Sequence, residues 1–237
     1  NGGLGMNTGI QDAFDLGWKL SAMLDGWGGA ALLDSYDWER RPAAARAAQM
    51  SLDNYYRLTS AAPSTAIETP GPEGDAVRRA TGARLVAENE KSWHPIGIHL
   101  GYIYQPSPIV VPDGTPVPED DTIDYRPTAI PGARAPHCWL GPDRSILDLY
   151  GTGFVLLDFG SGEGAALAAA AAERRVPLAV HPICDEGAAR LYEAKLVLVR
   201  PDGHVAWRGA RLPADPLALI DRMRGAASRI AARRRSD

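Results

Sequence analysis

The chain has 237 residues, of which 45% are hydrophobic and 23% charged, and its formal net charge is −4. This is the composition of an ordinary globular protein of one or two domains, with enough apolar material to form cores. The weakly acidic balance gives no electrostatic basis for binding nucleic acid, and no apolar run approaches the length that spans a membrane. We therefore expect neither nucleic acid nor a membrane as a partner.

The chain begins Asn-Gly-Gly-Leu-Gly-Met-Asn-Thr-Gly, a glycine-rich turn that runs into a helical pattern. Gly2, Gly3 and Gly5 allow positive φ and a close approach of backbone to a ligand. A helix that starts here offers free N–H groups and the positive end of its dipole, which favour an anionic or electron-rich ligand atom. The turn does not match the dinucleotide-binding fingerprint G-x-G-x-x-G. The alternative is an ordinary helix start, with Asn7 or Thr8 as N-cap and glycines that serve only the turn.

Two helices are expected next. Residues at three- and four-residue intervals predict one apolar stripe that packs inward along a first helix; they are Ile10, Ala13, Phe14, Gly17, Leu20, Ser21 and Leu24. A second helical stretch is predicted over about 30–57, with a break or a fresh start at Pro42. Its charged residues are most simply a solvated face; they are Asp34, Glu39, Arg40 and Arg41.

The middle of the chain contains turn signals. Residues 61–75 are predicted to be a loop, a helix follows, and residues 95–111 alternate like a strand. Tyr102 and Tyr104 of this strand either contact a substrate or pack, and packing is the role expected of an aromatic residue in a strand. Residues 112–131 are rich in Pro and Asp and predict an interdomain linker. Its carboxylates are expected to be solvated rather than catalytic; they are Glu119, Asp120, Asp121 and Asp124.

The last hundred residues alternate strands and helices. The predicted elements are a strand over 154–159, a helix over 164–174, a buried strand over 177–183 and a hairpin with strands over 196–200 and 204–208. Asp215 caps a last helix, whose inward residues are Leu217, Ile220, Met223, Ala227 and Ile230. A β-α-β unit followed by β-β-α is the plan of a thioredoxin-like domain.

Redox and metal sites are not indicated. Cys138 and Cys184 belong to no C-x-x-C, and residues 160–163, which follow the first strand, contain no cysteine. The thioredoxin-like domain should therefore be redox-inert. The five histidines show no ligand spacing, so we assign no metal. A reduced, cytoplasmic setting fits this cysteine usage best.

Two regions resemble one known family. Residues 3–13, the Trp-Lys-Leu at 18–20 and the Glu-Arg-Arg-Pro at 39–42 resemble the second flavin-binding motif of the FAD-dependent aromatic hydroxylases, single-component flavoprotein monooxygenases that include phenol hydroxylases. Residues 131–137 and 198–209 resemble the C-terminal domain of the same family, and the two regions occur in the family's order.

The resemblance implies a cofactor site and a reaction. Met6 and Asn7 would offer their N–H groups to the N1/C2 carbonyl edge of FAD, with Gly3 and Gly5 letting the ring approach, while the catalytic residues stay unassigned. In this family NAD(P)H reduces the flavin, oxygen adds at C4a, and the hydroperoxide passes an oxygen atom to a phenolic or polycyclic aromatic substrate.

The expected fold is α/β. Residues 1–111 form the helical C-terminal part of a flavin-binding domain, 112–131 the linker, and 132–237 the thioredoxin-like domain. An N-terminal FAD-binding half would be missing, so that the chain alone should be inactive, and the last domain would serve packing or homodimerisation. The alternative is a non-catalytic interaction module built on that redox-inert domain.

Overall fold

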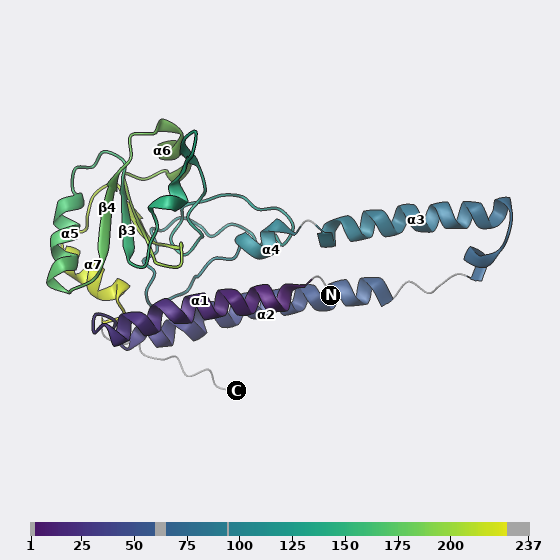
Figure 1. The fold of residues 1–237 in the computed structure, drawn as a ribbon, viewed down its shortest axis with the longest axis horizontal. Coiled ribbons are helices and arrows are strands. Elements are labelled where there is room, and N and C mark those ends of the chain that lie inside the picture. Colours follow the sequence, from purple (N-terminus) through teal and green to yellow (C-terminus); the bar gives the residue numbers. More distant parts are fainter. Residues whose placement is uncertain (1–2, 60–64, 94, 227–237) are drawn as a thin grey trace.

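A computed structural model of the chain describes residues 3–59, 65–93 and 95–226. Figure 1 shows two long helices lying side by side along one edge of the molecule, an α/β part at one end, and a further helix that extends away from it. The elements of the helical part are α1 (Leu4–Leu24), α2 (Ala31–Thr59), the 3-10 helix η1 (Thr65–Glu68), α3 (Pro72–Trp93) and α4 (Ile96–Leu100).

The helix that begins at the glycine-rich turn starts earlier than Asn7 or Thr8. Gly3 is the N-cap of α1, with φ 65°, and no side chain caps the helix. The interpretation with Asn7 or Thr8 as N-cap is therefore wrong. Glycine suits this position because the left-handed conformation costs it nothing. Gly2 lies outside the described residues.

Helix α2 passes through Pro42 without a break, contrary to expectation. Proline removes one N–H from the helical ladder, but alanine and arginine, which favour the helix, surround it.

The predicted strand over 95–111 is also wrong: this stretch begins with the short helix α4 and continues as irregular chain. Two prolines, Pro106 and Pro108, interrupt this stretch and cannot donate to a strand ladder. The predicted loop over 61–75 contains η1 and the start of α3, and residues 60–64 lie outside the described residues.

The apolar stripe predicted on α1 faces outward. Ile10 and Phe14 are 60% and 59% exposed, and Leu20 and Leu24 are exposed as well. The buried residues of α1 are Leu4, Asp15, Trp18, Lys19 and Ala22. The helix therefore packs on α2 and the α/β part through a mixed polar and aromatic face, because charged partners on its neighbours replace the aliphatic contacts that the spacing predicted.

The α/β part contains the predicted β-α-β and β-β-α order. Its sheet has the order β4-β3-β5-β6, in which β3 and β4 are parallel and the other neighbours antiparallel. The elements are β3 (Phe154–Asp158), α5 (Gly164–Glu173), β4 (Leu178–Pro182), α6 (Glu186–Tyr192), β5 (Leu196–Val199), β6 (Val205–Gly209) and α7 (Pro216–Met223). A small ribbon precedes them: β1 (Trp139–Gly141), β2 (Arg144–Ser145) and the 3-10 helix η2 (Ile146–Leu149). This confirms the thioredoxin-like fold.

Details of the domain differ from expectation. Strand β4 is at the edge of the sheet and half-exposed rather than buried, because it has a single neighbour. Asp215 caps α7 by accepting the Ala218 N–H at 2.9 Å, with Pro216 as the first residue, as predicted. The predicted inward residues Ala227 and Ile230 lie outside the described residues.

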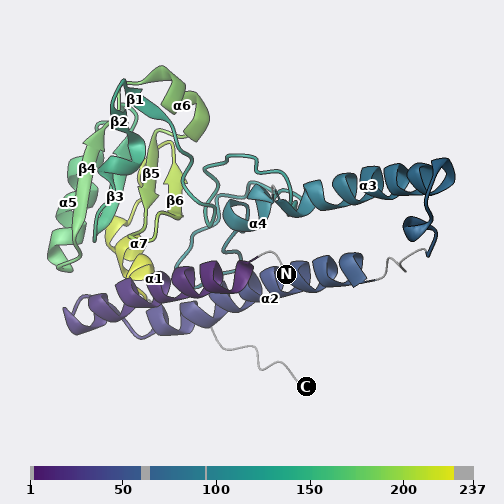
Figure 2. The same cartoon turned by 45° about the vertical axis from the view of Figure 1, so that its right-hand side comes forward.

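One hydrophobic core joins the two parts of the chain. Trp18 of α1 and Trp27 after it each meet Phe154 of β3 edge-on, with ring centroids 6.1 Å apart. The same cluster contains residues of α5, β5 and α7. Figure 2 shows α7 beside the α1–α2 pair, where Gly29 and Ala31 donate their N–H groups to the carbonyls of Arg224 and Gly225. A second cluster lies on the opposite face of the sheet, under α6.

Residues 112–131 contain no helix or strand but are tied to both parts. Arg46 of α2 pairs with Asp120, and Arg208 of β6 pairs with Asp113 at 2.6 Å. Residues 112–120 are exposed as whole residues, although the Asp113 side chain is partly covered by its contact with Arg208.

Candidate functional site

The start of α1 leaves backbone N–H groups without intrahelical partners. The N–H groups of Gly3, Leu4, Gly5 and Met6 precede the first intrahelical hydrogen bond, and no side chain caps them. Gly3, Gly5, Met6 and Asn7 are all exposed, and a Cβ on Gly5 would meet no atom within 4 Å. The backbone here is therefore open to a ligand.

Met6 and Asn7, the two residues expected to donate backbone N–H groups to a ligand, occupy different positions in the helix. The N–H of Met6 belongs to the free first turn, whereas the N–H of Asn7 is the first that can reach a helical carbonyl, that of Gly3. The Asn7 side-chain amide donates to the same carbonyl at 3.4 Å. Leu4 anchors the turn by packing in a small buried cluster with Met50 of α2 and Ile98 of α4.

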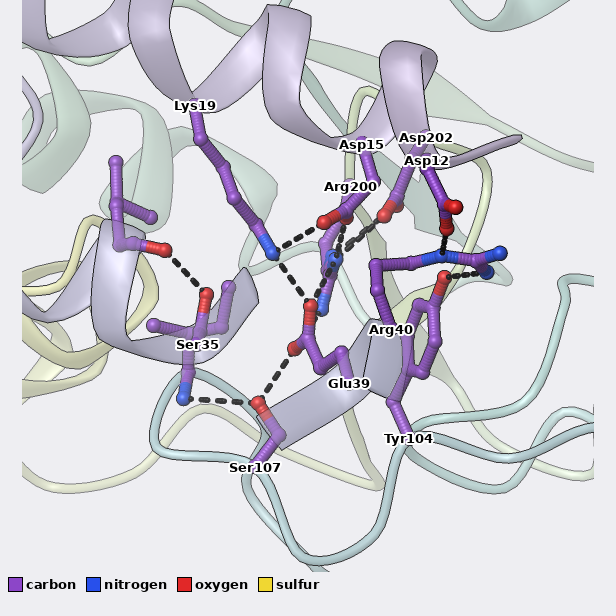
Figure 3. A network of polar contacts seen from close by, with 12 residues as sticks. Asp12, Asp15, Lys19, Ser35, Glu39, Arg40, Tyr104, Ser107, Arg200 and Asp202 are labelled. Carbon is purple, nitrogen blue, oxygen red and sulfur yellow. Dashed lines mark hydrogen bonds and ion pairs between the residues drawn. The ribbon is translucent and has the colours of Figure 1, made fainter. Parts of the chain in front are cut away.

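Further along α1 is a buried ion cluster, by which we mean Asp15, Lys19, Glu39, Arg200 and Asp202 (Figure 3). Lys19 donates to Asp15 and to Glu39 of α2, both at 2.7 Å. Arg200, which follows β5, donates to both oxygens of Glu39 at 2.6 and 2.9 Å, and to Asp15 at 3.1 Å. Side chains from three separate segments thus meet in one place.

The ion cluster has three carboxyl groups for two cations, and the pKa values of the three carboxyl groups are shifted in different directions. Burial and the charge of Asp202 raise the pKa of Asp15 to about 7. Burial also disfavours the charged Glu39, but Arg200 and Lys19 outweigh it and lower the pKa of that carboxyl. Arg200 likewise holds the pKa of Asp202 well below its ordinary value against burial. Asp15 is therefore the member that takes up a proton near neutral pH.

A second set of polar contacts lies closer to the start of α1. Arg40 donates to Asp12 at 2.7 Å and to the Tyr104 hydroxyl at 2.9 Å (Figure 3). The ring of His204 lies 4.3 Å from that of Tyr104, and burial lowers the pKa of this histidine. The prediction of a solvated face is therefore wrong for Glu39 and Arg40, which are buried, whereas Arg41 is exposed beside Asp37.

The ion cluster was missed because its partners lie far apart in the chain. A local signal exists: Asp15 and Lys19 are one helical turn apart on either side of a tryptophan, which is the spacing of an i,i+4 pair. Nothing in the sequence brings Arg200, 161 positions after Glu39, to that pair.

A cleft of about 410 Å³ opens between α1 and the α/β part. It is lined by aromatic and polar side chains, among them Phe14, Tyr102, Arg134, Tyr150 and His204.

The described residues contain no cluster of His, Cys, Asp and Glu that could hold a metal ion. None of the described helices is long and apolar enough to cross a bilayer. Both cysteines are free thiols, and burial and Asp185 raise the pKa of Cys138.

Known families match both ends of the chain. Residues 1–51 match the family described as FAD binding domain, and residues 128–232 match the C-terminal region of the aromatic-ring hydroxylases. The FAD-dependent monooxygenase apdD of Emericella nidulans is 39% identical over 223 residues, covering 88% of this chain and 35% of that protein. The 4-methyl-5-nitrocatechol 5-monooxygenase of a Burkholderia species is 35% identical, over 94% of this chain and 40% of that protein.

Solved structures agree over nearly the whole chain. The rebeccamycin biosynthetic enzyme RebC with reduced flavin superposes with a TM-score of 0.87 at 45% identity, covering 95% of this chain and 42% of that one. Aklavinone-11 hydroxylase with FAD and aklavinone gives a TM-score of 0.66 at 30% identity, over 92% and 39%. The chain thus spans less than half the length of these relatives. With both family matches in order and this shared fold, the chain belongs to the FAD-dependent aromatic-ring hydroxylases.

Proposed function

We propose that this chain is the C-terminal part of a monooxygenase that uses FAD and NAD(P)H to hydroxylate a phenolic or polycyclic aromatic compound. The observation that carries the proposal is the open start of α1, which lies inside the region that matches the FAD-binding family. There is open space beside Gly3 and Gly5, no side chain caps the helix start, and Gly3, Gly5 and Met6 are exposed. These features fit the electron-rich pyrimidine edge of a flavin.

In the proposed site the N–H of Met6 donates to the N1/C2 carbonyl edge of FAD, while Gly3 and Gly5 let the ring come close. Asn7 holds the turn through its bond to the Gly3 carbonyl. The helix dipole stabilises negative charge on the reduced ring by roughly 0.3–1 kcal/mol, and by more when the site is buried. Bound FAD would accept hydride from NAD(P)H and activate dioxygen at its C4a carbon.

The substrate class is proposed from the relatives. Their names include a nitrocatechol monooxygenase, tetracenomycin monooxygenases and a 2,4-dichlorophenol monooxygenase, and one similar structure holds aklavinone. These compounds are substituted or fused aromatic rings. We propose the same class here, without choosing the compound or the ring position.

The proposal divides the chain into the end of the flavin-binding domain (1–111), a connecting segment (112–131) and the thioredoxin-like domain (132–237). A preceding FAD-binding half would complete the cofactor site and cover the outward apolar stripe of α1. The exposed Ile10, Phe14, Leu20 and Leu24 support this, because contiguous apolar surface of this kind marks a binding face.

The experiment is to purify the complete protein that contains this chain and record its visible spectrum. We expect bound FAD, and NAD(P)H oxidation that rises when a phenolic or polycyclic aromatic compound is added. Incubation under ¹⁸O₂ should add one labelled oxygen atom to the product. A protein without a flavin spectrum that forms a stable dimer through the thioredoxin-like domain would instead support the non-catalytic interaction module.

A further inference from the structure

Arg200 belongs to the α/β part, but its guanidinium binds carboxylates of the two long helices, α1 and α2. The side chain is fully buried and donates to Glu39 of α2 through two nitrogens, at 2.6 and 2.9 Å, and to Asp15 of α1 at 3.1 Å. Its Nε donates to Asp202 of its own turn at 3.0 Å. The guanidinium carbon lies over the rings of Trp18 and Tyr104, 5.3 and 5.1 Å from their centroids.

The carboxylates that bind Arg200 have few other means of neutralisation. Glu39 accepts from Lys19 at 2.7 Å and from the Ser107 hydroxyl at 2.5 Å, and Asp15 accepts from Lys19. Without Arg200, three buried carboxylates would face one lysine. Uncompensated buried charge is strongly destabilising, so the helices would have to move apart or admit water.

The first half of α1 depends on such polar contacts. Between Leu4 and Asp15 the helix has no buried residue, and its apolar side chains Ile10 and Phe14 face outward. In that interval Asp12 pairs with Arg40. Apart from Leu4, which packs with Met50 and Ile98 at the helix start, the apolar packing of α1 begins at Trp18, in the core shared with the α/β part.

We infer that Arg200 is a positioning residue for the glycine-rich turn at the start of α1: by holding Asp15 and Glu39 together, the thioredoxin-like domain sets the direction in which α1 presents its N-terminus. Asp15 lies eleven residues after Leu4, about 16 Å along a rigid helix. A small rotation at Asp15 therefore displaces the N–H groups of Gly5 and Met6. The inference rests on the proposed function, in which that turn binds FAD, and gives a domain without redox cysteines a part in the reaction.

Arginine is needed here for its shape as well as its charge. A planar guanidinium can bind both Glu39 oxygens and still reach Asp15, whereas a lysine ammonium is a single point charge on a flexible stem. Arg200→Lys therefore keeps the net charge of the ion cluster while removing the fixed geometry between the two helices.

The test compares Arg200→Lys with Arg208→Lys in the complete protein. Arg208 is a matched control, since it is buried in the same domain but binds Asp113, Thr115 and the Tyr192 carbonyl, away from α1 and α2. Two quantities are measured: the FAD dissociation constant, and amide hydrogen exchange of residues 5–14 without FAD, with the amides of α5 as internal reference.

For Arg200→Lys we expect at least tenfold weaker FAD binding and at least tenfold faster exchange over residues 5–14, with α5 unchanged. Arg208→Lys should change either quantity by less than twofold. Wild-type affinity and exchange in Arg200→Lys would overturn the inference, and so would equal changes in Arg208→Lys. An Arg200→Lys protein that fails to fold while Arg208→Lys folds would assign Arg200 to global stability and overturn the positioning role.

The same measurements distinguish a failure of the proposed FAD site from a failure of the positioning role of Arg200. A wild-type protein that binds no FAD would refute the flavin site. The exchange comparison is made without FAD, so it would still decide whether Arg200 positions α1.

Discussion

At the scale of single residues, the glycines of the opening turn have separate roles. Gly3 adopts the left-handed conformation that ends the turn, with φ 65°, while Gly5 is already in α1. The sequence interpretation gave both the same reason, positive φ and close approach. Only Gly3 has a positive φ, so any requirement for glycine at position 5 must come from the close approach of a ligand rather than from the backbone conformation.

This separation makes Gly5→Ala informative. In the exposed first turn of α1 alanine meets no neighbour and favours the helix by about 0.5–1 kcal/mol, so stability without flavin should rise. If the flavin ring approaches Gly5 closely, FAD affinity should fall about tenfold in the same variant. Thermal melting and flavin titration measure the two effects. Gly9→Ala is the matched control, since Gly9 is also exposed with open space around it. A Gly5→Ala protein with unchanged affinity would remove Gly5 from the flavin site.

Asp15 gives a pH prediction. Its folded-state pKa of about 7 lies above that of an unfolded aspartate, so the folded protein holds a proton that the unfolded chain has released. This contribution to stability is complete below about pH 4 and is lost as the pH rises through 7. Asp15→Asn cannot ionise. Between pH 5 and 8 the wild type should lose at least about 1 kcal/mol relative to this variant in urea unfolding.

Glu39 and Asp202 do not disturb that comparison. Their pKa values are lowered, so they lose their stabilising charge only under acidic conditions, below this window. A difference in unfolding free energy between wild type and Asp15→Asn that stays constant from pH 5 to 8 would contradict a proton on Asp15.

At the scale of elements, α1 and the segment 112–131 show what periodicity can and cannot tell. Apolar spacing predicted the helix correctly but not which face is buried, because the spacing does not say which neighbour lies where. The Pro- and Asp-rich composition of 112–131 predicted an interdomain linker. The segment contains no helix or strand, and it is tied to α2 by Arg46 and to β6 by Arg208.

The connecting segment gives an experimental prediction. Residues 112–120 are exposed and irregular, so limited proteolysis should cut there before it cuts the β5–β6 hairpin. Mass spectrometry of early fragments should find two pieces that separate within this stretch. Equal protection of the segment and the hairpin would mean that further contacts cover it, as in a dimer.

At the scale of the whole molecule, the helical and α/β parts share one core as well as the ion cluster. Phe154 of β3 is the contact for both Trp18 and Trp27 and is 2% exposed. The parts should therefore unfold together, although they match two different domain families.

Phe154→Ala tests this shared core. The substitution removes a buried aromatic ring and should cost about 3–5 kcal/mol of unfolding free energy. Since the tryptophans lie in α1 and just after it, the loss should appear in one transition by both near-UV and far-UV circular dichroism. Two separate transitions, with the helical part unaffected, would show that the parts are energetically independent.

The family, the β-α-β and β-β-α order of elements, the hairpin turn and a helix at the glycine-rich start could all be predicted from the sequence. The elements are encoded locally, by turn residues, by a cap such as Asp215, or by short apolar segments. The sequence did not predict which face of α1 is buried, that α2 continues through Pro42, or that Arg200 reaches Glu39 and Asp15; these follow from the folded arrangement of the chain. The reason is physical: whether a charged side chain is solvated or buried depends on partners that fold beside it, and here those partners lie more than 150 residues away along the chain.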